Sequence, residues 1–164
     1  MYNINMKKII ILLLALFSFA ACNQPAKPTP TTKHILPALK GHSYNFSEKI
    51  QQKPVLIAFM AGYCGWCKKM LPYMDQIAER VDPSKVDVII GFMDTDADSL
   101  RSLEPVKNAT TIDIYYDAEP LMREQGVEGF PTIILFKNGK QEQVWNGYSP
   151  NHIDSILEKI KKIK

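Results

Sequence analysis

The sequence predicts an α/β fold in which a central mixed β-sheet is flanked by helices. Segments rich in β-favouring apolar residues alternate with segments of helical periodicity from residue 54 onward. Asn138-Gly139 stands between two β-favouring runs and predicts a hairpin towards the C-terminus. The third observation is the run CGWC over 64–67, which stands where the first central strand gives way to a helix.

Length and composition indicate one packed domain. The chain has 164 residues, of which 46% are hydrophobic and 23% are charged. The net charge is +3, and removing residues 1–21, which hold Lys7 and Lys8 and no acids, lowers it by two to +1. This balance argues against a strongly basic nucleic-acid binder, so no nucleic-acid partner is expected.

Residues 1–21 have the pattern of a secretory signal peptide. Lys7 and Lys8 precede an apolar run over 9–19 that is too short to span a bilayer. The run FAAC over 19–22 resembles the lipobox of bacterial lipoproteins, which implies that Cys22 is lipidated and begins the mature chain. The alternative is ordinary cleavage nearby that leaves Cys22 as a free thiol.

The expected domain covers residues 34–164. Residues 22–33 are expected to form the lipidated N-terminus and a flexible Pro- and Thr-rich tether. The domain opens with a hairpin over 34–50 that turns at 40–42, and a short turn is expected to lead from it to the first central strand.

The first central strand is Val55 to Met60, and its continuous apolar run predicts burial on both faces. The helix after the CGWC run carries apolar residues at three- and four-residue spacing: Met70, Leu71, Met74, Ile77 and Ala78. A second buried-type strand is predicted over 86–93.

Three acids with the spacing of a calcium loop follow the second strand. Ser99 and Pro105 stand where that loop requires Gly and Glu, so we reject a calcium site. The acids are expected to cap the next helix instead. They are Asp94, Asp96 and Asp98.

An inserted strand and helix follow. Thr111 to Tyr116 is β-branched and aromatic and predicts the strand. Asp117 is expected to be the N-cap of a helix over 118–125 that Gly126 ends.

The C-terminal part predicts a hairpin and a closing helix. The strands of the hairpin are expected over 133–137 and 140–147. Ser149-Pro150 predicts the N-cap and first position of the helix. Its apolar face consists of Ile153, Ile156, Leu157 and Ile160.

The pair Cys64 and Cys67 indicates redox chemistry. A strand–turn–helix context places Cys64 at a helix N-terminus, where free N–H groups and the macrodipole stabilise a thiolate. The first alternative is half of a zinc site, but no second ligand pair accompanies it, and His34, His42 and His152 are scattered. The second is a static disulfide, which would restrict the unfolded chain little across so short a loop. No metal site is predicted.

Two longer segments resemble a known family. FMAGYCGWCKKMLP is similar to the active-site segment of thioredoxin, and GVEGFPTIILFKNGK resembles its cis-proline strand and hairpin. The N-terminal hairpin and the inserted strand are more similar to the TlpA/ResA subgroup of membrane-attached thiol-disulfide reductases. The resemblance covers about residues 35–163 and implies a thioredoxin fold.

The resemblance also implies roles for individual residues. Cys64 would be the exposed nucleophile and Cys67 the buried resolving thiol. Pro131 would be a cis-proline facing them, and the backbone of Phe130 would pair with an extended substrate segment. Pro72 would kink the helix. These implied roles, with the residues between the cysteines, define the expected site: Cys64, Gly65, Trp66, Cys67, Phe130 and Pro131.

The roles of three residues close to the cysteines have two interpretations each. Trp66 keeps an N–H that proline lacks and offers apolar contact area to a partner, or it simply fills a helix start. Lys68 and Lys69 favour the Cys64 thiolate, or they are solvated lysines.

The chain departs from the family pattern at the proton acceptor for Cys67. Ala58 stands where thioredoxin has a buried acid, and Met70 stands where ResA-like proteins have a Glu. The usual acceptor is therefore missing at both positions.

The function implied by the resemblance is a lipid-anchored, envelope-facing oxidoreductase that reduces protein disulfides. It would be a monomer without a bound cofactor, held at a bacterial membrane through Cys22. A membrane electron donor of the DsbD/CcdA type would reduce it again. The alternatives are a disulfide oxidase or isomerase on the same scaffold, or a non-catalytic binding module.

Overall fold

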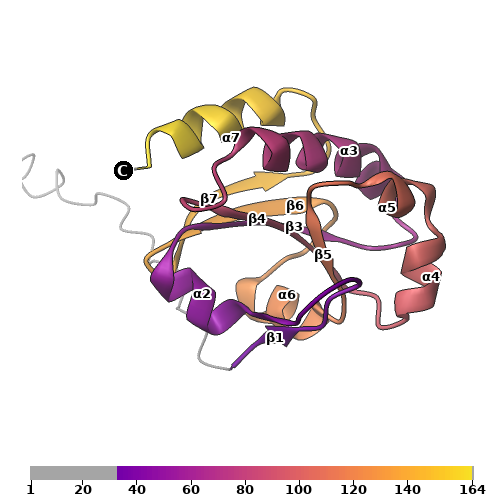
Figure 1. The fold of residues 1–164 in the computed structure, drawn as a ribbon. Coiled ribbons are helices and arrows are strands. Elements are labelled where there is room, and N and C mark those ends of the chain that lie inside the picture. Colours follow the sequence, from indigo (N-terminus) through magenta and orange to yellow (C-terminus); the bar gives the residue numbers. More distant parts are fainter. Residues whose placement is uncertain (1–32, 164) are drawn as a thin grey trace, which may run out of the picture.

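Strand β3 (Val55–Met60) is the central strand of a five-stranded sheet in the computed structural model, which describes residues 33–163. It pairs parallel with β4 (Asp87–Phe92) and antiparallel with β6 (Thr132–Lys137). Strand β5 (Asp113–Tyr115) is parallel to β4, and β7 (Lys140–Asn146) is antiparallel to β6. The strand order is therefore β5-β4-β3-β6-β7, and the predicted mixed sheet is confirmed (Figure 1).

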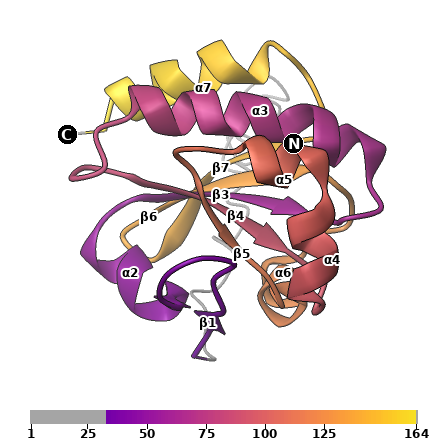
Figure 2. The same cartoon turned by 45° about the vertical axis from the view of Figure 1, so that its right-hand side comes forward.

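Helices cover both faces of the sheet. Helices α3 (Gly65–Arg80) and α7 (His152–Lys161) lie on one face, side by side (Figure 2). Helices α2 (Phe46–Gln52) and α6 (Glu119–Gln125) lie on the other (Figure 1). Because side chains alternate along β3, Leu56, Ala58 and Met60 pack towards α3. Val55, Ile57 and Phe59 pack towards α2 and α6.

The N-terminal hairpin is present, but the short turn expected after it is wrong. Strands β1 (Ile35–Leu36) and β2 (Tyr44–Asn45) pair antiparallel, as predicted. Helix α2 then replaces the turn, because Phe46 and Ile50, four residues apart, are both buried on one helical face.

Only one of the three acids after β4 caps a helix. Asp96 is the N-cap of α4 (Ala97–Ser102), and its carboxylate accepts the N–H groups of Asp98 and Ser99. Asp98 instead pairs with Arg101, and Asp94 binds the loop before the cysteines. Helix α5 (Glu104–Asn108) follows α4 directly.

Two predicted N-caps are wrong. Asp117 has a positive φ of 54° and precedes the real N-cap of α6, Ala118, which has no side-chain cap bond. Ser149 and Pro150 lie in a turn before α7, whose N-cap is Asn151. The expected end of the helix at Gly126 is confirmed, and this residue has the left-handed conformation common at helix C-termini.

Strand β5 is shorter than the predicted strand over 111–116 because Asp75 of α3 binds the backbone of the residues just before β5. The carboxylate accepts the N–H groups of Thr110, Thr111 and Ile112 at 3.1, 2.9 and 2.8 Å. These N–H groups are then not available for hydrogen bonds to a neighbouring strand. One carboxylate thereby joins α3 to the edge of the sheet.

We expect Asp75→Ala to lower the free energy of unfolding by about 2 kcal/mol at neutral pH, because three donors lose a charged acceptor. Burial raises the pKa of Asp75, but these hydrogen bonds outweigh it, and the net pKa lies below the ordinary 3.8. The stabilisation is therefore present above pH 3.8 and is lost as the pH falls through the lower folded value.

Denaturant titrations of wild type and variant at pH 7 and pH 3 measure this effect. The difference in free energy of unfolding between wild type and Asp75→Ala should be smaller at pH 3 than at pH 7. Glu79→Ala, an exposed acid of the same helix, is the matched control and should change little. A constant difference at both pH values would contradict the assignment.

Several N-terminal predictions lie outside the described residues. These are the signal peptide over 1–21, the lipidated Cys22 and the tether up to residue 32. Between residues 33 and 163, no helix combines the length and apolarity that crossing a bilayer requires.

Candidate functional site

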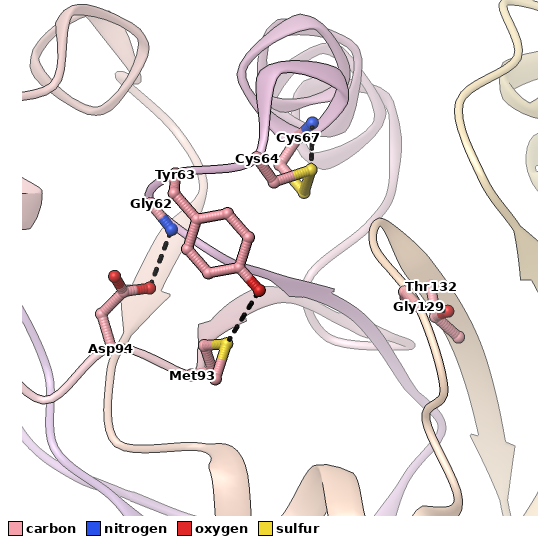
Figure 3. The surroundings of a disulfide bond; sticks show 8 residues. All are labelled: Gly62, Tyr63, Cys64, Cys67, Met93, Asp94, Gly129 and Thr132. Carbon is pink, nitrogen blue, oxygen red and sulfur yellow. Dashed lines mark hydrogen bonds between the residues drawn. A yellow bond between two sulfur atoms is a disulfide. The ribbon is translucent and has the colours of Figure 1, made fainter.

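The cysteine pair lies at the carboxyl end of β3, where the chain turns into α3. Cys64 is the N-cap of α3, as predicted, and forms a disulfide with Cys67 across the first turn (Figure 3). Their Cα atoms are 5.2 Å apart. The backbone N–H of Cys67 donates to Cys64 Sγ at 3.1 Å. In the dithiol form this donor points at the sulfur that becomes the thiolate.

The two sulfurs differ in access. Cys67 is 1% exposed, whereas Cys64 is partly exposed. Large side chains close to Cys64 in the chain are open to solvent, since Tyr63 before it is 76% exposed and Trp66 two residues after it is 56% exposed. A partner protein can therefore reach Cys64, while Cys67 can be reached only from within the pair.

Cys67 sits in an apolar environment. Ala58 and Met70, the two positions where relatives carry an acid, are fully buried in the same cluster as Cys67. Across residues 33–163 no Asp or Glu side chain is buried. Such surroundings disfavour the thiolate of Cys67, and no buried carboxylate of the described residues is available to accept its proton.

The predicted cis-proline is confirmed, because the Phe130-Pro131 peptide bond is cis. Thr132 pairs with Phe59, so Pro131 continues the register beside Met60, at the end of β3 that leads to the cysteines. Figure 3 draws Gly129 and Thr132, which flank this bond, on one side of the disulfide and Asp94 on the other. Pro131 is buried and Phe130 is half-buried.

An aromatic cluster that the sequence did not reveal lies beside the site. The ring of Trp66 stacks on that of Tyr148, with centroids 5.5 Å apart and planes at 20°. Tyr73 contacts the same tyrosine at 5.9 Å, and the ammonium of Lys69 lies 4.4 Å from the Trp66 centroid. Trp66 is thus more than a filler of the helix start, and Lys69 contacts its ring.

Part of this aromatic cluster could have been predicted from the spacing of its residues in the sequence. Lys69 and Tyr73 follow Trp66 by three and seven residues, which places all three on one face of α3. Tyr148 follows β7 and has no local signal of this kind. It reaches the site because the N–H of Gly147 donates to the carbonyl of Pro131 at 2.8 Å.

Asp94 fixes the loop that precedes Cys64. Its carboxylate accepts the N–H of Gly62 at 2.8 Å, and its carbonyl accepts the N–H of Asp117. A Cβ on Gly62 would stand only 2.9 Å from the Asp94 carboxylate, so a larger residue here would displace the side chain that holds the loop. The hydroxyl of Tyr63 donates to Met93 Sδ at 3.8 Å on the same side (Figure 3).

A groove of about 450 Å³ is lined by residues that neighbour the cis-proline in the chain, among them Gly129 and Thr132. Phe130, Glu128 and Gly147 contribute to its wall, together with polar side chains of α6 and β7. As for metals, no group of three His, Cys, Asp or Glu residues within 33–163 is arranged to hold an ion.

Comparison with known proteins gives consistent matches. A sequence model described as Thioredoxin matches residues 38–121. The chain is 32% identical over 123 residues to a protein disulfide-isomerase of Hordeum vulgare, covering 74% of this chain and 20% of that protein. It is 29% identical over 102 residues to a thioredoxin domain-containing protein 5 homolog of Drosophila melanogaster, covering 62% and 20%. The chain thus spans about a fifth of the length of these curated relatives.

Solved structures share the architecture at low sequence identity. The pneumococcal exposed lipoprotein thioredoxin (Etrx1) of Streptococcus pneumoniae strain TIGR4 is 22% identical, with a TM-score of 0.66 over 80% of this chain and 99% of that one. StoA from Bacillus subtilis is 16% identical, with a TM-score of 0.66 over 82% and 100%. At such identities the likeness concerns the fold alone.

Proposed function

Because this chain belongs to the thioredoxin family, we propose that it is a thiol-disulfide oxidoreductase that reduces disulfide bonds of other proteins. The predicted thioredoxin fold is confirmed by the family match and the solved structures. One observation carries the proposed activity: a partly exposed Cys64 at a helix N-terminus is bonded to a buried Cys67, at the end of β3 beside which cis-Pro131 continues the register of β6.

The proposed reaction begins with the dithiol form. The Cys64 thiolate attacks one sulfur of a partner disulfide, which forms a mixed disulfide and releases the other sulfur as a thiolate. Cys67 then loses its proton and attacks Cys64 Sγ, which forms the internal disulfide and releases the second partner thiolate. Both released thiolates take up protons, and two electrons have passed to the partner.

The surroundings of Cys64 support the reductive direction. The residues between the cysteines, Gly65 and Trp66, add no charge, and the Lys69 ammonium lies over the Trp66 ring. The helix N-terminus and the Cys67 N–H then remain as the main stabilisers of the thiolate, because Lys68 and Lys69 are exposed and solvent screens their charge. Strong disulfide oxidants owe their potential to a highly stabilised reduced form, and such additional stabilisation is missing between these cysteines.

Isomerase activity is the second candidate, because the Hordeum vulgare relative is named a protein disulfide-isomerase. Both activities begin with the same attack by Cys64. They differ in whether Cys67 oxidises the pair or the mixed disulfide rearranges within the partner.

Two assays test the direction. Equilibration with glutathione should give a potential for the Cys64–Cys67 pair well below about −150 mV, and insulin disulfides should be reduced catalytically. A potential above that value would refute the reductase proposal. Recovery of scrambled ribonuclease without net reduction would favour the isomerase.

The cellular setting belongs to the same proposal. The domain is a monomer, faces the cell envelope and is anchored by a lipid on Cys22, and a membrane dithiol carrier of the DsbD/CcdA type returns it to the dithiol form. The N-terminal pattern supports this, as does the hairpin β1–β2 with the inserted β5, which favours the TlpA/ResA subgroup. Cys22→Ala in the full chain should move the protein from the membrane to the soluble fraction. Retention in the membrane would contradict the anchor.

A further inference from the structure

Exposed apolar side chains gather at Cys64. Among residues 33–163, four large hydrophobic side chains are exposed, and two of them, Tyr63 and Trp66, stand one residue before and two residues after Cys64. The other two are Ile35 and Val144. Large apolar groups held in water at a reactive centre are typical of a surface that a partner covers.

Trp66 is held in place although it is exposed. Tyr148 stacks on its ring, Tyr73 contacts Tyr148 with the two hydroxyls 3.4 Å apart, and Lys69 lies over the indole. A partner therefore meets an aromatic surface that is already ordered, so little side-chain entropy is lost on binding.

The charge on this side of the site is positive and uncompensated. Lys68 and Lys69 are both exposed, and neither has an acidic partner in the described part of the chain. A carboxylate is therefore complementary to the α3 side of the site, where both ammonium groups are exposed.

The aromatic surface lies where a bound segment would pass. The hydrogen bond from Gly147 to Pro131 fixes the turn that carries Tyr148 against the cis-peptide. An extended segment that pairs with the backbone at Phe130 would therefore place its neighbouring side chains over Trp66 and Tyr148.

We infer that Trp66, Tyr148 and the two lysines form a docking surface that selects among protein disulfides. It takes segments that carry an aromatic or large aliphatic side chain next to the reacting cysteine and a carboxylate beyond it. This inference rests on the proposed oxidoreductase activity and names its substrate class.

Four short disulfide-bonded peptides test the inference with the dithiol form of the full chain. They differ only next to the cysteine (Phe or Ser) and beyond it (Asp or Lys), and kcat/KM is measured for each at low and high salt. We expect the Phe/Asp peptide to be about tenfold better than the Ser/Asp peptide and several-fold better than Phe/Lys. The Asp preference should weaken as salt rises.

Variants assign each preference to its residues. Trp66→Ala should abolish the preference for Phe, and Trp66→Phe should restore most of it. Lys68→Ala combined with Lys69→Ala should abolish the preference for Asp. Lys85→Ala, an exposed lysine away from the cysteines, is the control and should keep both preferences. Ratios between peptides are compared within each variant, so a change in thiol reactivity cancels.

The outcomes separate the two proposals. Equal kcat/KM for all four peptides, with catalytic turnover intact, would refute the docking surface and leave the oxidoreductase standing. Preferences that survive in the variants would refute the assignment to these residues. An absence of turnover with every peptide and with insulin would overturn both proposals.

Discussion

Cys64→Ser is expected to abolish the catalytic reduction of protein disulfides, whereas Cys67→Ser is expected to stop the reaction halfway. The first variant lacks the partly exposed sulfur that begins the exchange. The second retains it but lacks the buried sulfur that would release the partner. Turnover of insulin should fall to the uncatalysed rate in the first variant, a loss of at least about a thousandfold.

The stalled intermediate gives the two variants opposite signatures. Cys67→Ser should accumulate a stoichiometric mixed disulfide between Cys64 and the partner, visible as a heavier species by mass spectrometry without reductant. Cys64→Ser should accumulate none. Because Cys67 is 1% exposed, a mixed disulfide formed on Cys67 instead would contradict the division of roles.

Ala58→Asp should destabilise the fold and speed the resolving step. Ala58 has no exposed surface and packs in the cluster that contains Cys67. A carboxyl group introduced there has no buried partner and must fit a filled space, so we expect the free energy of unfolding to fall by about 3 kcal/mol. Once ionised, the carboxylate can accept the Cys67 proton, which should accelerate resolution of the mixed disulfide about tenfold or more.

The pH dependence of this variant has a definite sign. Burial raises the pKa of the introduced carboxyl above its unfolded value of about 3.9. The folded state then holds more protons than the unfolded state between the two pKa values, so the loss of stability grows as the pH rises. The rate gain should appear only above the folded pKa.

Ala58→Asn separates packing from proton transfer. It has nearly the same size as the Asp variant and no acid, so it should lose stability without gaining rate. Stopped-flow measurement of partner release, with denaturant titrations at several pH values, gives both quantities. Equal resolving rates in the Asp and Asn variants would show that proton removal from Cys67 does not limit the reaction.

Local patterns predicted the elements with strong and continuous signals. The run Val55–Met60, the apolar spacing of α3 and the turn Asn138-Gly139 lie where they were expected, and both turn residues have positive φ. In each case residues a few positions apart decide the structure. The positions of the cysteine pair and of Pro131 could be predicted for the same reason, and the family resemblance predicted that the bond before Pro131 is cis.

Local patterns failed where a distant residue competed for the same groups. Helix α2 forms because Phe46 and Ile50 are buried against the sheet. Asp94 was expected to cap a helix, yet its carboxylate accepts the N–H of Gly62, which lies in the loop after β3. The strand over 111–116 was shortened because Asp75 takes its N–H groups.

By itself, the sequence determined the spacing of the cysteine pair, its position at a helix start and the lack of an acid at Ala58 and Met70. The resemblance implied an exposed Cys64 and a buried Cys67, and the structure confirms both exposures, but only the tertiary structure decided that Trp66 stacks on Tyr148. The physical reason is that thiol chemistry and helix capping depend on neighbours along the chain. Exposure and aromatic stacking depend on which segments the sheet brings together, and here the hydrogen bond between Gly147 and Pro131 does so.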